Sequence, residues 1–288
     1  MSLKTYLKRG LTYVIKGVPQ KKVSASITYL STNELLKGRT AFITGGTSGI
    51  GFAIAKAFLN SGANVIITGR NSQKLEEKCR LLSNKPEYKN KVLGIVMDNK
   101  KVDTFKEHLD NVINHFGKID ILVNNAGVIG GAIKNTTEEE YDTIMQTNLK
   151  AVFFLSQLVG KYMKEKHIEG NILNITSSSS LRPAVSAYTI SKWGIRGLTM
   201  GLARSLAPYG IVVNGLAPGQ TATPMLQKKE TDDLYNPSTL INRYATAEEI
   251  ANMAVILTSN MSRSIIGDIV YMTGGSGLLS FEDMDYSF

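Results

Sequence analysis

Short apolar runs alternate with longer segments whose apolar residues recur at helical spacing, from about residue 39 almost to the end of the chain. Such runs are typical of strands buried in a parallel sheet, and the longer segments are typical of helices that cover it. We therefore expect an α/β protein with a three-layer, doubly wound Rossmann fold: a parallel sheet of about seven strands with helices on both faces and ligands at the carboxyl ends of the strands. The expected strands are residues 40–43, 64–68, 92–98, 119–123, 171–176, 211–214 and 268–272.

One expected helix has an unusual interior. Residues 138–161 read as a long helix, and Asn148 lies within it. Asparagine is a poor interior helix residue because its amide competes for backbone hydrogen bonds. Its presence predicts a local distortion of the helix that has a use. The other expected helices are residues 50–62, 72–82, 102–116, 188–208 and 247–259.

Residues 1–38 do not follow the alternation, and we interpret them as an N-terminal extension before a single domain of residues 39–288. Residues 1–20 mix lysine and arginine with apolar residues at roughly helical spacing, which is typical of a basic amphipathic helix. Such a helix could touch an anionic membrane, but we favour an extension that packs on the body or on a neighbouring subunit. Residues 23–30 alternate enough to form a short strand.

Composition narrows the function classes. The 288-residue chain carries 33 Lys plus Arg against 24 Asp plus Glu, and the net charge of +9 favours anionic ligands such as nucleotide phosphates. No basic block interleaved with aromatic residues is present, so we expect no nucleic-acid partner. The single cysteine fits a reducing, cytoplasmic compartment, and the three histidines lack metal-ligand spacing, so we expect no metal. No apolar run is long enough to predict a transmembrane helix.

A glycine-rich turn follows the first expected strand directly. Its glycines Gly45, Gly49 and Gly51 permit a tight turn and a close approach of the backbone to a ligand. The helix that follows would direct free N–H groups and a positive dipole end at a pyrophosphate. The turn residues Thr47, Ser48 and Ile50 complete this expected phosphate site.

The second expected strand ends in Gly69 and Arg70. In a dinucleotide fold this strand end meets the adenosine ribose, where an acid repels a 2′-phosphate and an arginine pairs with it. Because the acid is missing and Arg70 supplies a positive charge, we expect NADP(H) to be preferred over NAD(H). Asp98, at the end of the third expected strand, is placed to accept from the adenine amino group, and a capping role is an open alternative.

Three further segments lie near the expected ligand edge of the sheet. Small residues at Asn125, Ala126 and Gly127 would let a cofactor pass close to the backbone, and residues 217–224 form a turn-rich segment suited to its nicotinamide end. Residues 225–244 are polar and irregular, which favours a mobile substrate lid. The acidic, aromatic tail beyond residue 277 could plug a site or reach a neighbouring subunit.

Tyr188 and Lys192 carry the candidate chemistry. On a helix, positions four apart share a face, so the ammonium can lie beside the phenol. A free phenol titrates near pH ~10, and a close cation is expected to lower its pKa toward the range of general acid–base catalysis. A run of serines, Ser177 to Ser180, precedes the pair.

These motifs, taken in order, resemble the short-chain dehydrogenase/reductase superfamily, and most closely its 3-oxoacyl-carrier-protein reductases. The resemblance covers about residues 38–277. It rests on Thr44-Gly45-x-x-x-Gly49-x-Gly51, Asn124-Asn125-Ala126-Gly127, Ser177, Tyr188-x-x-x-Lys192 and Pro218-Gly219-x-x-x-Thr223.

The resemblance implies a role for each matched residue. Tyr188 would protonate the carbonyl oxygen. Lys192 would lower the pKa of Tyr188 and hold the nicotinamide ribose, and Asn148 would anchor a water that links Lys192 to solvent. A serine would hydrogen-bond the substrate oxygen; the register selects Ser177, with Ser178 as the alternative. Asn125 would hold the cofactor ribose, and the residues flanking the nicotinamide would be Pro218, Gly219, Thr221 and Thr223.

The implied function is an NADP(H)-dependent oxidoreductase for a ketone/secondary alcohol pair, with a 3-oxoacyl thioester, a sugar or a polycyclic alcohol as substrate. A homotetramer or dimer built on the helices that contain Asn148 and Tyr188 is also implied. The alternative is a nucleotide-binding regulator or scaffold that kept the fold and lost turnover. Ile190 replaces a small residue common in the family, which could alter packing behind the tyrosine.

Overall fold

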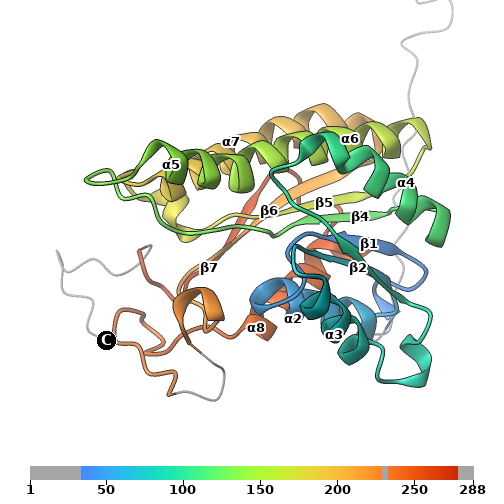
Figure 1. Ribbon diagram of the computed structural model, residues 1–288, viewed down its shortest axis with the longest axis horizontal. Helices are drawn as coiled ribbons and strands as arrows, with labels where there is room; N and C mark the ends of the chain where they lie inside the picture. Colours follow the sequence, from blue (N-terminus) through green and yellow to red (C-terminus); the bar gives the residue numbers. More distant parts are fainter. Residues whose placement is uncertain (1–33, 229–232, 278–288) are drawn as a thin grey trace, which may run out of the picture. The chain divides into compact units, whose positions relative to one another are not determined.

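A single parallel sheet organises the protein, as the computed structural model in Figure 1 shows; residues 34–228 and 233–277 are described. The strand order is β3-β2-β1-β4-β5-β6-β7, and every neighbouring pair is parallel. The chain winds outward from the centre in both directions, so β1 and β4 flank the switch point where such folds bind ligands. The strands are β1 Thr40–Ile43, β2 Asn64–Gly69, β3 Val92–Val96, β4 Ile121–Asn124, β5 Asn171–Ile175, β6 Val212–Pro218 and β7 Ile269–Met272.

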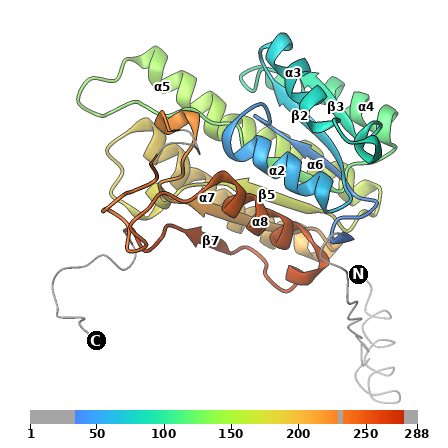
Figure 2. The same ribbon diagram turned by 90° about the horizontal axis from the view of Figure 1, so that it is seen from below.

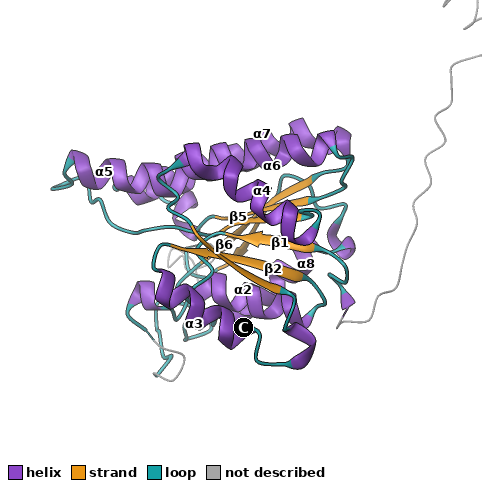
Figure 3. Ribbon diagram, turned by 45° about the vertical axis from the view of Figure 1, so that its right-hand side comes forward, coloured by secondary structure: helices purple, strands orange, loops and turns teal. Residues whose placement is uncertain are grey.

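Helices cover both faces of the sheet, which confirms the predicted three-layer Rossmann fold (Figure 3). One face carries α4, α6 and α7, and the other carries α2, α3 and α8 (Figure 1). Each layer has its own apolar cluster of buried side chains. The helices are α2 Gly49–Asn60, α3 Ser72–Leu82, α4 Phe105–Phe116, α5 Glu138–Met145, α6 Ala151–Glu165, α7 Ala187–Leu206 and α8 Ala247–Thr258.

Helices α2 and α8 lie side by side on the sheet (Figure 2). Their buried faces contain many small residues, including Ala53 and Ala55 of α2 and Ala251 and Ala254 of α8. Small side chains let two helices approach closely, so α8 packs along α2, while α2 covers β1 and β2 and α8 covers β5 and β6. Because α2 is fixed along its length, its first turn is held in place at the carboxyl edge of the sheet.

The long helix expected at residues 138–161 is interrupted where Asn148 predicted a distortion. Helix α5 ends at Met145, a π-helical turn spans Gln146–Lys150, and α6 continues to Glu165. Single π-helical turns inside α-helices are often found at functional sites. The predicted distortion is confirmed, and its consequence for the site is described below.

Several element boundaries differ by a few residues from those predicted, and two of the differences have a clear structural form. Strand β6 was expected to end at Asn214 but continues to Pro218, because the chain pairs with β7 up to Met272 despite its glycine and proline. The helix expected from Val102 begins with a 3₁₀ turn, and its α-helical part starts at Phe105. The expected N-terminal helix and strand, and the acidic tail beyond residue 277, lie outside the described residues.

The amino edge of the sheet, opposite the carboxyl ends of the strands, holds a closed polar cluster. The Arg39 guanidinium donates to the carbonyl oxygens of Thr258 at 2.6 Å and Asp120 at 3.1 Å. The Asp120 carboxylate accepts from the Thr40 amide at 2.8 Å and from Lys118 Nζ at 3.0 Å. Burial lowers the pKa of Arg39 to about 10, and the charge of Asp120 opposes that shift.

Among the described residues, no helix is long and apolar enough to cross a membrane.

Candidate active site

A cavity of about 850 Å³ opens at the carboxyl edge of the sheet, at the switch point between β1 and β4. The loops that follow β1 to β7 and the first turns of α2 and α7 supply its walls. Asn148, the remaining predicted site residue, is fully buried behind the wall. The predicted residues that line the cavity are Gly45, Thr47, Ser48, Gly49, Ile50, Gly51, Arg70, Asp98, Asn125, Ala126, Gly127, Ser177, Tyr188, Lys192, Pro218, Gly219, Thr221 and Thr223.

The glycine turn leaves no room for side chains where it passes beneath the cavity. Gly45 has φ +66°, and a Cβ there would lie 2.9 Å from Ala126 Cα. Gly49 has φ +51°, and a Cβ at Gly51 would collide with the Asn125 amide and the Gly45 carbonyl oxygen. Only glycine fits these three positions, so the backbone itself forms the floor of the site.

Helix α2 begins at this turn without the usual side-chain cap. Asn71, Thr137, Ser186 and Thr246 each cap the helix that follows them. Within the described part of the chain, Ser48 makes no such bond, and the first turn of α2 contains no acid. The first amide groups of α2 and its dipole are therefore available to a ligand phosphate.

Thr44 and Asn125 brace the turn from below. The Thr44 hydroxyl accepts from the amides of Asn125 and Ala126, both at 3.0 Å. The Asn125 side chain donates to the carbonyl oxygens of Thr44 at 2.9 Å and Gly45 at 3.1 Å. Asn125, expected to hold the cofactor ribose, thus uses its amide to shape the phosphate loop. The sequence analysis did not predict this role of Thr44. The available signal was its position directly before the first glycine of the turn.

The far end of the cavity lies beyond β2 and β3. Arg70 lines it, together with Asn71 and Lys74 from the first turn of α3. Lys74 was missed, although a basic residue four positions after Arg70 on an expected helix was visible. The Asp98 carboxylate accepts from the Lys100 amide at 3.0 Å, so it braces a turn while also lining the cavity.

The near end of the cavity is built on α7 and the serine run. The Ser186 hydroxyl accepts from the Thr189 amide and starts α7, which places Tyr188 in its first turn and Lys192 one turn later. Lys192 Nζ lies 5.6 Å from the Tyr188 ring centroid and donates to the Ile175 carbonyl oxygen at 2.9 Å. The Ser177 hydroxyl is hydrogen-bonded to Tyr188, which favours Ser177 over Ser178 as the serine of the site.

The predicted lowering of the Tyr188 pKa by Lys192 is wrong for the protein alone. Burial raises the pKa of Tyr188, and the hydrogen bond from Ser177 opposes that rise. Burial also lowers the pKa of Lys192 to about 8. Desolvation disfavours the charged form of both groups, and at 5.6 Å from the ring the ammonium does not overcome it.

Asn148 holds the wall behind these residues. Its side-chain oxygen accepts from the Val128 amide at 2.9 Å, and its nitrogen donates to the Val128 carbonyl oxygen at 2.9 Å and to Ser191 Oγ at 3.1 Å. A Cβ at Gly127 would lie 3.4 Å from Asn148 Oδ1 and 3.8 Å from Lys192 Nζ, so the three residues converge. Both N–H groups of the Asn148 side chain are therefore committed to protein acceptors.

The segment after β6 closes the near end. Thr223 packs against Gly49, where a Cβ would lie 3.3 Å from its methyl group. Pairing of Thr221 with Ala245 then ties this segment to the loop before α8. Met225 and Leu226 face the cavity from a 3₁₀ turn at Pro224–Leu226.

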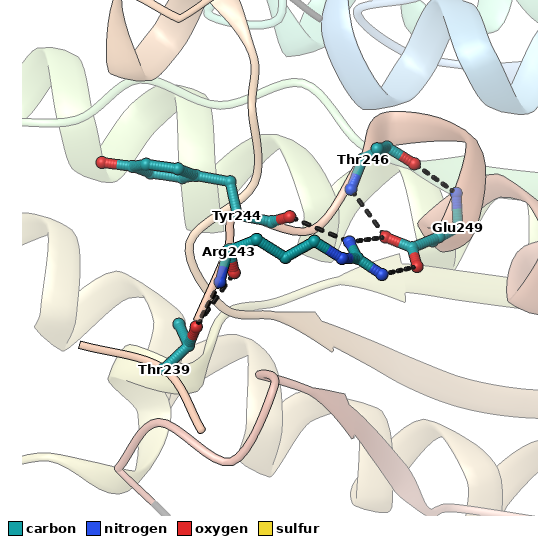
Figure 4. A network of polar contacts seen from close by, with 5 residues as sticks. All are labelled: Thr239, Arg243, Tyr244, Thr246 and Glu249. Carbon is teal, nitrogen blue, oxygen red and sulfur yellow. Dashed lines mark hydrogen bonds and ion pairs between the residues drawn. The ribbon is translucent and has the colours of Figure 1, made fainter. Parts of the chain in front are cut away.

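The second half of the expected lid is anchored by the network in Figure 4. Arg243 forms a two-pronged pair with Glu249, with distances of 2.9 and 2.8 Å. Glu249 also accepts from the Thr246 amide, which completes the capping box of α8, and Arg243 is bonded to Thr239 through its backbone. The predicted irregularity of residues 225–244 is confirmed, since their described part contains most of one short 3₁₀ turn and one isolated bridge, between Tyr235 and Arg243. Their mobility stays a prediction.

The sheet order and the uncapped helix above a glycine floor define a dinucleotide-binding protein of the Rossmann class. Residues 39–234 match the family model for short chain dehydrogenases. Gluconate 5-dehydrogenase of Gluconobacter oxydans is 33% identical over 247 residues, covering 83% of this chain and 95% of that protein. The 3-oxoacyl-acyl-carrier-protein reductase of Thermotoga maritima is 34% identical over 248 residues, covering 83% and 98%.

A solved structure agrees with these matches. A short-chain dehydrogenase/reductase from Mycobacterium marinum superposes with a TM-score of 0.78 at 29% identity, covering 86% of this chain and 100% of that one. The chain belongs to the short-chain dehydrogenase/reductase family. It is therefore an oxidoreductase for alcohol and ketone substrates that uses an NAD(P) cofactor.

Proposed function

We propose that the protein transfers a hydride between NADP(H) and a ketone/secondary alcohol pair, with Tyr188 as the general acid or base. The observation that carries this proposal is the convergence of Ser177, Tyr188 and Lys192 in one cavity with the glycine floor. The uncapped first turn of α2 and the absence of room for a Cβ at Gly45 and Gly51 fit a dinucleotide pyrophosphate.

The residues of this chain bind the substrate oxygen and move a proton. When bound, the nicotinamide supplies or accepts the hydride. In the reduction direction, the Ser177 hydroxyl donates a hydrogen bond to the carbonyl oxygen, and the Tyr188 phenol donates its proton to that atom. Because burial raises the pKa of Tyr188, the phenol is protonated at neutral pH, which suits it to act as the acid.

The direct test is NADPH oxidation with a panel of ketones that includes oxo acids, sugar ketones and oxo thioesters. Turnover that is lost in Tyr188→Phe while cofactor binding persists is the expected result. Cofactor binding without turnover on any carbonyl would instead favour the regulator or scaffold alternative. Circular dichroism of the variant establishes that the fold is retained.

The preference for NADP(H) is supported by charge at the far end of the cavity. Arg70 and Lys74 line this end, and Gly69 lies beside them, where a Cβ would come within 2.6 Å of the Thr47 methyl group. A guanidinium and an ammonium can both bind a 2′-phosphate, and Arg70 can do so with two hydrogen bonds. We expect Arg70→Ala to weaken NADPH binding by about tenfold or more and to leave NADH binding within about twofold. An unchanged ratio of the two affinities would remove Arg70 from the cofactor site.

A homo-oligomer, a tetramer or a dimer, is supported by exposed apolar side chains on the outer helices. Phe153 and Phe154 of α6 and Trp193 and Met200 of α7 are each between 39% and 56% exposed. Exposed patches of this kind are typical of interfaces between copies. Light scattering of the native protein and of Phe153→Glu tests this, since a monomeric native protein would contradict it. A cytoplasmic location stays a prediction.

A further inference from the structure

Arg182 is a cavity residue that has no part in the site as described so far. Arg182 follows the serine run and lines the same cavity as Ser177 and Tyr188. Its side chain is exposed, whereas Lys192 is buried and already bonded to a backbone carbonyl. Arg182 is therefore the accessible cation at the near end of the cavity.

The backbone of Arg182 is held in one conformation. Its amide donates to the Ser179 carbonyl oxygen at 3.1 Å, and its own carbonyl accepts from the Trp193 indole at 2.8 Å. Its φ of −100° and ψ of 154° are the extended values that the following Pro183 favours. A guanidinium on a fixed backbone loses less conformational entropy when it binds a ligand.

The side chain of Arg182 extends over the turn that follows β7. A Cβ at Gly277 would lie 3.1 Å from Arg182 Nη2 and 3.3 Å from Nε. Ser276, beside that glycine, also lines the cavity. The guanidinium thus lies between the loops after β5 and β7.

Sheet order separates Arg182 from the far end of the cavity. Arg70 follows β2, which lies three places from β5 in the sheet. At a strand spacing of about 4.8 Å, this is roughly 14 Å, so the two arginines cannot share one phosphate group. Asp98, the one acid among the described residues that line the cavity, follows β3, one strand farther away.

The loops after β4 and β6, the neighbours of β5 in the sheet, also bring apolar side chains to the cavity. Val128 and Ile129 line the cavity from the loop after β4, and Met225 and Leu226 line it from the segment after β6. Ile129, Met225 and Leu226 are each more than 40% exposed, so they offer apolar contact to a ligand. One cation beside an apolar wall matches a small molecule with an aliphatic body and one anionic end.

We propose that Arg182 binds the carboxylate of the substrate, and that the substrate is an aliphatic oxo acid or the corresponding hydroxy acid. A guanidinium binds a carboxylate through two parallel hydrogen bonds. The carbonyl of the same molecule then reaches Ser177 and Tyr188, and its chain contacts the apolar wall. This proposal rests on the proposed function, because it names the substrate class of that site.

The kinetic test compares each acid with its uncharged methyl ester. NADPH oxidation is measured with 3-oxobutanoate and 4-oxopentanoate and with their methyl esters, for the native protein and for Arg182→Gln, Arg182→Lys and Arg80→Gln. The ratio of kcat/KM for acid over ester is expected to fall at least tenfold in Arg182→Gln and to recover partly in Arg182→Lys. Arg80→Gln, at the exposed end of α3, controls for the loss of a positive charge and is expected to leave the ratio unchanged.

A phosphate-bearing substrate is the other source of an anionic group. The 3-oxobutanoyl thioester of pantetheine 4′-phosphate is therefore assayed in parallel. If Arg182→Gln slows turnover of this thioester and leaves the acid-to-ester ratio unchanged, the carboxylate assignment is overturned.

A binding test separates this proposal from the proposed function. Trp193 is the single tryptophan of the chain and donates to Arg182, so its fluorescence reports on this loop. With NADP⁺ present, unreactive pentanoate is expected to change the signal in the native protein and in Arg80→Gln but not in Arg182→Gln, and uncharged pentanamide is expected to have little effect. Equal responses to pentanoate and pentanamide would overturn the role of Arg182 even if ketones are reduced. A pentanoate response without turnover would retain the carboxylate site and overturn the proposed hydride transfer to a ketone.

Discussion

Each edge of the sheet has a cation and a tyrosine whose pKa values are shifted by burial, but the partners of these groups differ between the two edges. Each edge has a cation whose pKa is lowered by burial: Arg39 at the amino edge and Lys192 at the carboxyl edge. Each also has a tyrosine whose pKa is raised by burial and partly restored by a hydrogen bond, Tyr162 at the amino edge and Tyr188 at the carboxyl edge. Burial alone therefore does not distinguish a reactive group from a structural one.

The partners make the difference. Arg39 has two backbone carbonyls and the opposing charge of Asp120, which in turn has Thr40 and Lys118 as partners. Lys192 donates to one carbonyl, burial is the cause of its pKa shift, and its surroundings open into the cavity. The amino edge is a satisfied cluster that stabilises the fold. At the carboxyl edge, burial of the charged Lys192 reduces the stability of the fold, and the same group lines a cavity where it can bind a ligand.

The strongest way to break this comparison is to remove one phenolic hydroxyl from each edge. Tyr188→Phe is expected to lower kcat/KM by about 10³-fold, because the proton donor is lost. Tyr162→Phe removes a matched hydroxyl and is expected to leave kcat/KM within about twofold. Both are measured by NADPH oxidation with the best ketone of the panel. Comparable losses in the two variants would show that the phenol at the carboxyl edge has no special role.

The next largest effect is expected for stability at the amino edge. Asp120→Ala removes the acceptor of the Thr40 amide and the charge that opposes burial of Arg39. Breaking such a cluster is expected to reduce the free energy of unfolding by roughly 3–5 kcal/mol. Urea denaturation measures the loss, and kcat/KM per folded molecule is expected to stay within about twofold. A selective loss of activity at unchanged stability would contradict the division between the two edges.

Removing the charge of Lys192 is expected to increase the free energy of unfolding, whereas Asp120→Ala is expected to reduce it. Its folded pKa of about 8 lies below the ordinary value of 10.5, so below pH 8 both states hold the proton and the folded state carries the full penalty. Between these values the unfolded state binds more protons, so the free energy of unfolding rises with pH. Lys192→Met is expected to be inactive yet more stable at pH 7, by up to about 3 kcal/mol, and the gain should shrink as pH rises toward 10.5.

Urea denaturation without added cofactor, at several pH values from 7 upward, measures this gain. Lys161→Met, on the exposed surface of α6, is the matched control and is expected to show no such slope. A Lys192→Met variant less stable than the native protein at pH 7 would show that the ammonium stabilises the fold.

The smallest effect is expected for a paired charge near the carboxyl edge. Arg243 holds the pKa of Glu249 at about 2, so this contribution to stability is complete above the ordinary pKa of 4.5 and is lost as pH falls toward 2. Both side chains are about 40% exposed, so solvent screening limits the contribution, and Glu249→Gln is expected to cost about 1 kcal/mol at pH 7. Thermal unfolding at pH 7 and pH 3 measures it. A larger cost at pH 3 than at pH 7 would contradict the pairing.

The sequence could predict the sheet because each buried strand is a continuous apolar run, with no alternative use for residues such as Phe42 and Ile43. It could also predict the distortion at Asn148, since an amide in a helix interior conflicts with local preference. It could not predict the length of β6, because pairing with β7 overrides the turn preference of its glycine and proline.

Within the site, the motif residues were found and their surroundings were not. The pKa of Tyr188 depends on burial by segments distant in sequence, so the spacing of a cation four residues away gave the wrong direction. The bracing by Asn125 depends on its position against the glycine turn, eighty residues earlier. Lys74 and Arg182 were given no role in the site from the sequence, and the structure shows that both line the cavity.

The π-helical turn at Gln146–Lys150 also sets the rotational phase between two helices. In an α-helix each residue advances the side-chain direction by about 100°, so one residue more or fewer would rotate everything beyond it by that angle. Deleting one residue here would turn the apolar stripe of α6, including Val159 and Met163, away from the sheet, or else turn Asn148 away from Val128. The π-helical turn therefore sets two side-chain directions at once. It lets the apolar face of α6 pack on the sheet while Asn148 points at Val128 beside the cavity.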